Sequence, residues 1–337
     1  MTRFLGFVAL LLLLGCTSHR AERVERAFYF WKSDSQISRA EDSLIQAAHV
    51  GKLYVKFFEV EPDSILGNRP TAKLQLYYHN DSLKIVPTVF IRNEVFRNAT
   101  KKSLDALAGN VNFLLHKYAR QGRFSGDSIT EYQMDCDWTK STKDNYFYFL
   151  EALKKVSGKQ ISCTLRLYPY KYQKEMGVPP VDRVMLMCYS LNNPLDDKST
   201  NSILDMRELD SYLGSEYPLP LDIALPTYSW MLVYQNDRFA KLLRAEPSDF
   251  NQTLKPLRPM WFEATQDIVV DGFYVRRGDR IKYEMVSGKQ LADAVARIKK
   301  RVRLDDQITV AFFHLDQTQL KLYKSEEINH LYTLFTD

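Results

Sequence analysis

Short apolar runs, rich in aromatic and β-branched residues, recur along the whole chain and are separated by polar segments. Runs of about four to eight such residues, bounded by turn-forming residues, are typical of buried strands. The eight runs are Ala27 to Trp31, Leu53 to Val60, Lys84 to Ile91, Glu131 to Trp138, Ile161 to Tyr168, Val184 to Tyr189, Ile223 to Trp230 and Ile308 to Leu315. The pattern therefore predicts eight strands in order.

Several of the polar segments carry apolar residues at helical spacing. Ser38 and Glu41 have the spacing of a capping box, which predicts that a helix begins directly after Ser38. Thr100 and Ser141 are predicted to cap two further helices, because each precedes a segment with helical period. Two more helices are predicted from Gly288 to Val302 and from Ser325 onward.

Strands that alternate with helices form right-handed βαβ units, and eight such units predict an α/β fold, a single (β/α)8 TIM barrel. The barrel domain is predicted over residues 26–337, with an insertion between strands 7 and 8 at about residues 231–286. Within the insertion, Asp271-Gly272 lies between apolar residues and predicts a hairpin. The stretch 62–81 has no clear helical pattern and is a candidate for an additional strand.

The N-terminus has the pattern of an export signal. Arg3 is followed by an apolar stretch over residues 4–14, which is shorter than the roughly 20 residues that span a bilayer. Leu13-Leu14-Gly15-Cys16 resembles the lipobox of bacterial lipoproteins. An ordinary secretory signal with a coincidental cysteine is the alternative.

The lipobox resemblance implies that residues 1–15 are removed and that Cys16 carries a diacylglycerol lipid. Thr17 stands where such lipoproteins have Asp as an inner-membrane retention signal, so the resemblance implies delivery to the outer membrane. Residues 16–25 would then form a polar tether between the lipid and the barrel. The membrane is therefore an expected partner, through the lipid on Cys16.

Composition narrows the functional classes. The 45% hydrophobic and 13% aromatic content predicts a large folded core. The 46 Lys and Arg residues are interspersed with 41 Asp and Glu residues, so the basic patch expected of a nucleic-acid-binding protein is not evident. Nucleic acid is therefore not predicted as a partner.

The remaining cysteines are Cys136, Cys163 and Cys188. Their odd number and the lack of C-x-x-C spacing argue against a disulfide framework, and we expect buried thiols, with a Cys136–Cys163 bridge as the minor alternative. No motif predicts a metal or cofactor, since neither H-E-x-x-H nor a dinucleotide-binding glycine pattern is present. His314, at the end of the last run, is a lone histidine and is expected to be structural.

The fourth run places acidic residues where a barrel carries its chemistry. In a strand, Gln133, Asp135 and Asp137 share one face, while the alternate residues on the other face are apolar. The apolar face should meet the helices, which directs both aspartates into the barrel. Arg166 on the fifth run is predicted to point inward as well and to pair with them. One interpretation is a buried structural network; the other is a functional pair, since repulsion between two acids raises the pKa of one of them.

The same segment carries a family resemblance. Asp135-Cys136-Asp137-Trp138 resembles the core of the D-x-x-D-x-D-W-E motif of glycoside hydrolase family 18, and Met187-Cys188-Tyr189 resembles that family's M-x-Y on the sixth strand. The resemblance implies that Asp137 and Tyr189 hold a substrate acetamido group. Thr139 occupies the position of the family's general acid and Tyr132 that of its first Asp. The chain also resembles envelope lipoproteins with a glycosidase-like barrel.

Thr139 cannot protonate a glycosidic oxygen, so catalysis would need other carboxyl groups. Glycoside hydrolysis ordinarily uses a pair of them. We predict Asp137 as the acid and Asp135 as its electrostatic partner, with Glu59 and Glu263 in reserve.

Aromatic rings at the strand ends suit a sugar-binding mouth, because sugar faces stack on flat rings. Each ring taken alone is more typical of core packing than of a ligand platform. The predicted substrate-binding residues are Trp31, Gln133, Arg166, Tyr168, Tyr189, Tyr228 and Trp230.

Three functions are consistent with these patterns. The leading hypothesis is an envelope-anchored, glycosidase-like barrel that acts on a glycan or polysaccharide. The second is a barrel that binds a glycan or a protein without catalysis, which Thr139 favours. The third is a structural lipoprotein whose insertion provides a contact surface.

Overall fold

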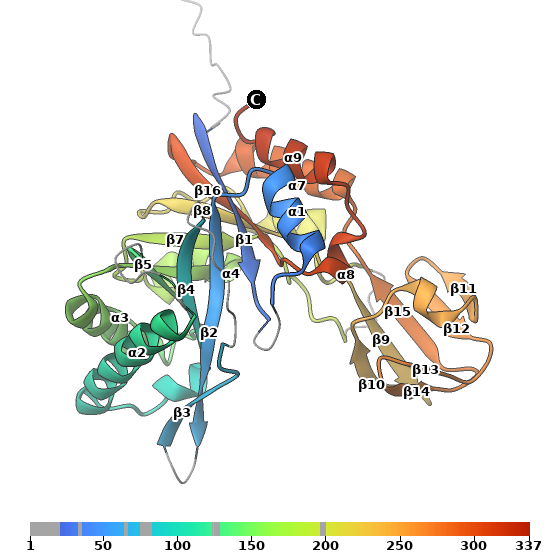
Figure 1. Ribbon diagram of the computed structural model, residues 1–337, viewed down its shortest axis with the longest axis horizontal. Coiled ribbons are helices and arrows are strands. Elements are labelled where there is room, and N and C mark those ends of the chain that lie inside the picture. The colour runs from blue at the N-terminus through green and yellow to red at the C-terminus, as the bar shows by residue number, and fades with distance from the viewer. Residues whose placement is uncertain are drawn as a thin grey trace, which may run out of the picture.

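The parallel barrel predicted from the sequence is present. The computed structural model describes residues 21–32, 36–63, 67–74, 83–122, 124, 129–195 and 200–337. The barrel strands are β1 (Arg23–Phe30), β2 (Lys52–Asp63), β4 (Lys84–Ile91), β5 (Glu131–Asp135), β6 (Gln160–Arg166), β7 (Arg183–Met187), β8 (Leu221–Pro226) and β16 (Gln307–Phe313). Each pairs in parallel with its neighbours, and β1 pairs with both β2 and β16, which closes the ring (Figure 1). The fold prediction is therefore confirmed.

Helices connect the strands on the outside of the barrel (Figure 1). Their bounds are α1 (Arg39–Ala47), α2 (Lys101–Gln121), α3 (Lys143–Ser157), α4 (Leu167–Lys171), α5 (Gln173–Met176), α6 (Met206–Tyr212), α7 (Gly288–Arg301), α8 (Gln317–Leu320) and α9 (Ser325–Thr333), with a short 3-10 helix at Asn93–Phe96. The capping box at Ser38 and the cap at Thr100 are present as predicted. The prediction of Ser141 as the third cap is wrong by one residue, because Thr142 is the N-cap of α3. The Thr142 hydroxyl donates to Asn93.

The stretch predicted to hold an additional strand contains β3 (Gly67–Thr71), which pairs antiparallel with the far end of β2. Strand β1 begins at Arg23, so the last residues of the predicted tether already belong to the barrel. The hydrogen bonds from the Glu22 and Arg23 amides to the carbonyl of Asp306 fix this start. The predicted signal at residues 1–15 lies outside the described residues.

The insertion forms a second sheet beside the barrel (Figure 1). Its five antiparallel strands lie in the order β10-β9-β15-β12-β11. Their bounds are β9 (Trp230–Gln235), β10 (Arg238–Leu243), β11 (Leu254–Arg258), β12 (Trp261–Ala264) and β15 (Arg280–Glu284), and the Asp-Gly turn joins β13 (Ile268–Val270) to β14 (Phe273–Val275). A separate apolar core around Met231, Val233 and Phe250 stabilises it. The barrel and the insertion thus have independent cores.

Six of the eight predicted strands end earlier than expected, and the ends of β6 and β8 each displace a predicted aromatic site residue. Strand β6 ends at Arg166, and Tyr168 lies in α4 because Pro169 lacks an N–H and fits the first turn of a helix. Strand β8 ends at Pro226, which has no N–H to continue the ladder, and Trp230 begins β9 of the insertion. Neither aromatic residue belongs to a barrel strand.

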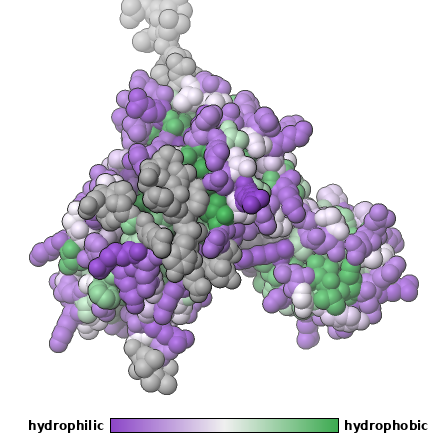
Figure 2. Space-filling view, viewed as in Figure 1, coloured by the Kyte–Doolittle hydropathy of each residue, from purple (hydrophilic) through white to green (hydrophobic). Residues whose placement is uncertain are grey.

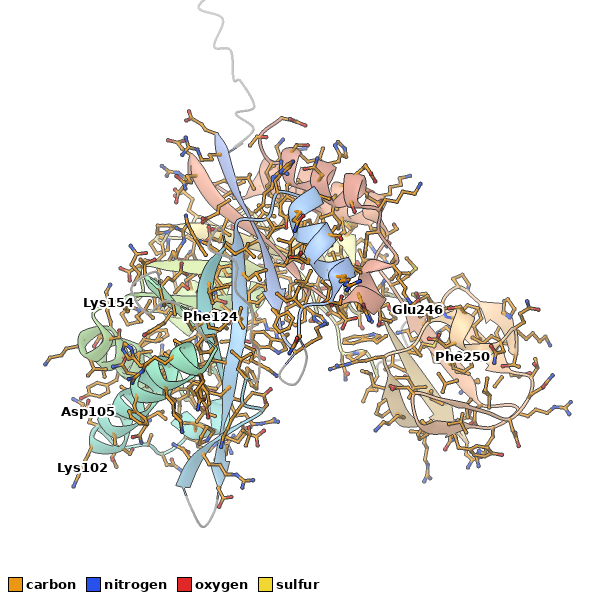
Figure 3. The ribbon with its side chains drawn as sticks, in the orientation of Figure 1. Lys102, Asp105, Phe124, Lys154, Glu246 and Phe250 are labelled. Atoms are coloured by element: carbon orange, nitrogen blue, oxygen red, sulfur yellow. The ribbon has the colours of Figure 1, made fainter. Side chains whose placement is uncertain are left out.

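A buried polar network joins the insertion to the barrel. The Glu284 carboxylate, fully buried, pairs with Lys282 at 2.7 Å and accepts hydrogen bonds from Ser202 and from Trp230 Nε1 at 2.7 Å. Nearby lies Glu246, which is labelled in Figure 3 at the start of the insertion lobe. Its carboxylate accepts hydrogen bonds from Ser229 and Tyr283. A buried carboxylate is stable only when it is paired and hydrogen-bonded in this way.

We expect Glu284→Gln to lower the free energy of unfolding by about 3–5 kcal/mol, because it leaves the buried Lys282 ammonium without its counter-charge. Chemical denaturation of the purified protein measures the change. The control is Asp237→Asn, which removes an ion pair with Arg280 at an 82% exposed carboxylate and should cost under about 1 kcal/mol. Equal losses in both variants would contradict a dominant role for the buried pair.

Candidate functional site at the barrel mouth

Two adjoining cavities open at the carboxyl ends of the barrel strands. The first, which we call the mouth cavity, has a volume of about 460 Å³ and is lined by residues that include Trp31, Asp135, Phe313 and Trp230. The second, the side cavity, has a volume of about 610 Å³ and is lined by residues that include Thr139, Tyr168 and Glu175. Asp137, Arg166, Tyr189 and Ser190 line both cavities and form the boundary between them. Three of these four are residues that the sequence predicts as site residues.

Asp135, the last residue of β5, lies in the mouth cavity. Its carboxylate accepts a hydrogen bond from the Thr164 hydroxyl at 2.6 Å. Burial, assisted by the charge of Asp137, raises the pKa of Asp135 to about 6, although Thr164 and Arg166 act in the opposite direction. Asp135 therefore holds a proton in about half of the molecules near pH 6.

Asp137 is held at the boundary of the cavities by the predicted ion pair with Arg166. Arg166 Nε and Nη2 donate to the two carboxylate oxygens of Asp137 at 2.7 and 3.3 Å. The Asp137 side chain is 54% exposed, so the pair does not seal the cavities. Asp137 is the acid expected from the sequence, but the buried surroundings favour Asp135 as the group that gives up a proton near pH 6.

Gln133 lies deeper in the barrel than predicted. It is fully buried, accepts a hydrogen bond from the Tyr29 hydroxyl at 2.7 Å and lines neither cavity. Strand alternation does direct it inward, but it is two residues nearer the closed end than Asp135. Its contacts fix the packing beneath the site and do not reach a ligand in either cavity.

Aromatic rings form the floor of the mouth cavity around Phe313. The ring centroid of Phe313 lies 5.6–5.8 Å from those of Trp31, Tyr189 and Tyr228. The Tyr189 hydroxyl donates to Met187 Sδ at 2.9 Å, and the hydroxyls of Tyr228 and Ser190 share a hydrogen bond at 2.9 Å. The sequence patterns do not single out Phe313, although it is an aromatic residue at a strand end like the rings that they do.

Tyr168 and Trp230, which the early ends of β6 and β8 displace, still reach the site. Tyr168, 46% exposed, lies on the rim of the side cavity and contacts Tyr172 with ring centroids 4.7 Å apart. Trp230 forms part of the wall of the mouth cavity. The structure thus gathers Trp31, Tyr189, Tyr228 and Trp230 at one cavity and Tyr168 at the other.

The other candidate acids differ in whether they line a cavity. Glu59 lines the mouth cavity and pairs with Lys56 at 2.6 Å. Glu263 lies on β12 of the insertion and lines neither cavity. Thr139 lines the side cavity, where its hydroxyl shares hydrogen bonds with Ser141 and Thr142. Of the two reserve acids, Glu59 therefore lies at the mouth cavity, and Glu263 lies away from both cavities.

His314 lines the mouth cavity, and its Nδ1 has no hydrogen-bond partner among the described residues. Burial lowers the pKa of His314 to about 4, opposed by Asp316 and assisted by the positive charge of Arg244. The imidazole is therefore neutral at pH 7. Because Arg244 follows β10, its influence on His314 shows that the insertion reaches the barrel mouth.

Cys136, Cys163 and Cys188 are buried free thiols, and the Cys136–Cys163 bridge is not formed. Over the described ranges, no group of three or more His, Cys, Asp or Glu side chains is arranged to hold a metal ion. In the same part of the chain, no helix has the length and apolar character needed to cross a membrane.

No protein-family model matches the chain, and no curated protein matches it in sequence. Among solved structures, the spore cortex-lytic enzyme SleL of Bacillus megaterium QM B1551 is 15% identical, with a TM-score of 0.51, and the match covers 90% of this chain and 73% of SleL. A class V chitinase from Nicotiana tobaccum is 12% identical, with a TM-score of 0.49, and the match covers 92% of this chain and 99% of the chitinase. The likeness to SleL and the closed ring of strands define a (β/α)8 barrel.

We expect Asp135→Asn to stabilise the protein by up to about 3 kcal/mol above pH 7, because the buried carboxylate no longer has to ionise. The folded-state pKa of about 6 lies above the ordinary value of 3.8, so Asp135 favours the folded state most at low pH, and this contribution is lost between about pH 4 and 6. The difference between variant and wild type should therefore grow over that interval and then stay constant.

Urea unfolding at pH 4, 5, 6, 7 and 8 measures the difference. Asp293→Asn, at an exposed position in α7, is the control and should show no such growth. A difference for Asp135→Asn that does not vary with pH would contradict the raised pKa.

Proposed function

We propose that this chain is an envelope-anchored, glycosidase-like lipoprotein that binds a glycan across the barrel mouth and hydrolyses it. The observation that supports hydrolysis is the position of Asp135 and Asp137 together in an aromatic-lined cavity. A carboxyl group with a raised pKa beside a second carboxylate is the arrangement that glycosidases use for acid catalysis.

In this proposal Asp135 protonates the glycosidic oxygen, and the bond between that oxygen and the anomeric carbon breaks. Asp137 stabilises the positive charge that develops on the anomeric carbon. Water then adds to this carbon and returns a proton to Asp135. Phe313, Trp31 and Trp230 hold the sugar by stacking, and Tyr189 and Tyr228 support the floor beneath it.

The second candidate is a barrel that binds glycan without cleaving it. Two observations favour it: Thr139 at the wall of the side cavity has no acidic proton, and the carboxylate of Asp137 is already occupied by Arg166. In this case the mouth cavity keeps its aromatic floor, and the acids serve only to orient the ligand.

A panel of neutral and acidic polysaccharides, assayed for new reducing ends and for binding, separates the two candidates. We expect wild-type turnover to fall as the pH rises through about 6, because Asp135 must be protonated. Asp135→Asn should lose at least about 100-fold in kcat and retain binding, whereas Phe313→Ala should weaken binding. Binding without turnover in the wild type would leave only the second candidate, and a protein that binds no glycan would contradict both.

The anchoring part of the proposal depends on Cys16 and the apolar segment before it. We expect the protein expressed in a Gram-negative host to fractionate with the outer membrane and to incorporate labelled palmitate. Cys16→Ser should abolish the labelling, while Cys188→Ser, at a buried thiol, should not. Labelling that survives Cys16→Ser would contradict the anchor.

A further inference from the structure

The cations around the mouth cavity differ in whether a carboxylate of the described residues pairs with them. Most of them have a carboxylate partner within 3 Å: Lys56 pairs with Glu59 at 2.6 Å, Arg166 with Asp137 at 2.7 Å, and Lys32, next to Trp31, with Glu41 at 2.6 Å. Arg244 is the exception. Within the described residues, its guanidinium makes no hydrogen bond or ion pair, although its backbone N–H donates to Asp271.

The position of Arg244 directs this charge toward the cavity. Leu243 is buried in the core of the insertion, and the alternation of the chain turns Leu242 and Arg244 to the opposite face, where both line the mouth cavity. Arg244 is exposed, and it is close enough to His314 to influence the pKa of that imidazole. A guanidinium therefore faces a cavity whose floor is made of aromatic rings.

Resting on the proposed function, we propose that the mouth cavity takes an acidic sugar and that Arg244 binds its carboxylate. A sugar that stacks on Phe313 and Trp230 presents its ring substituents to the walls, and the wall from the insertion offers the planar donors of Arg244. One positive charge, unpaired among the residues that the structure describes, matches one carboxylate. A doubly charged phosphate is disfavoured, because Asp135, Asp137 and Glu59 line the same cavity.

The position of Arg244 also limits where the carboxylate of the sugar lies. Asp135 is influenced by Asp137, Arg166 and Glu59 on the barrel, so the acidic residues gather on the barrel side of the cavity. Arg244 reaches the cavity from the insertion. The carboxylate of the sugar should therefore point toward the insertion, away from the aspartates.

Isothermal titration calorimetry with paired ligands tests the proposal. The probes are oligogalacturonate, oligomannuronate, hyaluronan oligosaccharides and glycan strands of peptidoglycan, each in its native form and with the carboxyl groups reduced to alcohols. A charge-assisted hydrogen bond predicts that at least one native form binds about 10- to 100-fold more tightly than its reduced form. Arg244→Gln should abolish this preference and leave the affinity for the reduced form unchanged, and Arg244→Lys should retain part of it.

Arg238→Gln is the matched control, since Arg238 is an exposed arginine on β10 that lines neither cavity. It should keep the full preference. Equal affinities of the wild type for both forms of every ligand that it binds would overturn the proposal and leave the proposed function intact. So would a preference that survives in Arg244→Gln, or tighter binding of a sugar-phosphate polymer than of any carboxylated glycan. A wild type that binds none of these probes in either form would overturn this proposal, and it would overturn the proposed function as well only if the protein also binds none of the neutral polysaccharides of the panel.

Discussion

Closure of the parallel sheet is the constraint on which the rest of this structure depends. Because β1 pairs with β2 on one side and with β16 on the other, all eight strands point the same way and their carboxyl ends meet in one ring. Residues that are far apart in the sequence, such as Trp31, Asp135 and Phe313, become neighbours only through this closure. The ring also leaves no sheet edge within the barrel, so each strand has a fixed register and a fixed inward face.

Because the inward faces of the strands are buried, charged side chains on them are unfavourable unless they have partners. The partners differ between the two ends of the barrel. At the closed end, charged side chains are neutralised in pairs: Lys52 lies 2.5 Å from Glu25, and Arg183 lies 2.6 Å from Asp222. At the open end, Asp135 has only the hydroxyl of Thr164 and the more distant charge of Arg166. Burial raises the pKa of Asp135 to about 6, and it raises the pKa of Asp222 to about 6 as well, although Asp222 is paired with Arg183. What distinguishes Asp135 is that it lines the mouth cavity, where a ligand can reach it, whereas Asp222 is enclosed in the base.

Much of the fold could be predicted because it follows from local periodicity. The eight apolar runs, the capping box at Ser38 and the Asp-Gly hairpin each depend on residues within one short segment. The Asp137–Arg166 pair could be predicted as well, since alternation on two adjacent strands determines which side chains face each other. The ends of β6 and β8 could not, because helix α4 and the insertion begin there without a break in the apolar pattern.

The contents of the site were harder to predict for a different reason. Phe313 is one of many aromatic residues at strand ends, and only the packed structure shows that it is central. Arg244 reaches the cavity from a separate sheet with its own core, so no period in the barrel strands refers to it. The depth of Gln133 and the burial of Asp135 are likewise properties of the closed ring, not of β5 alone.

The insertion also exposes apolar side chains to the surrounding solvent. Figure 2 shows a green patch on the insertion, and its large exposed apolar residues are Phe239, Leu257, Val269 and Tyr274. These residues lie on a sheet and a hairpin that are covered on one side by their own small core. The barrel beside it is mainly hydrophilic in this view.

The direction of β1 determines which end of the barrel is nearest to the point where the chain enters it. The chain enters the barrel at the amino end of this strand (Figure 1). The two cavities are at the other end, where residues that follow the carboxyl ends of the strands line them. A molecule held by the residues that precede Ala21 would therefore stand on its closed end, with the opening turned outward. In this orientation the barrel mouth would face away from the surface that holds the chain, toward ligands in the surrounding solvent.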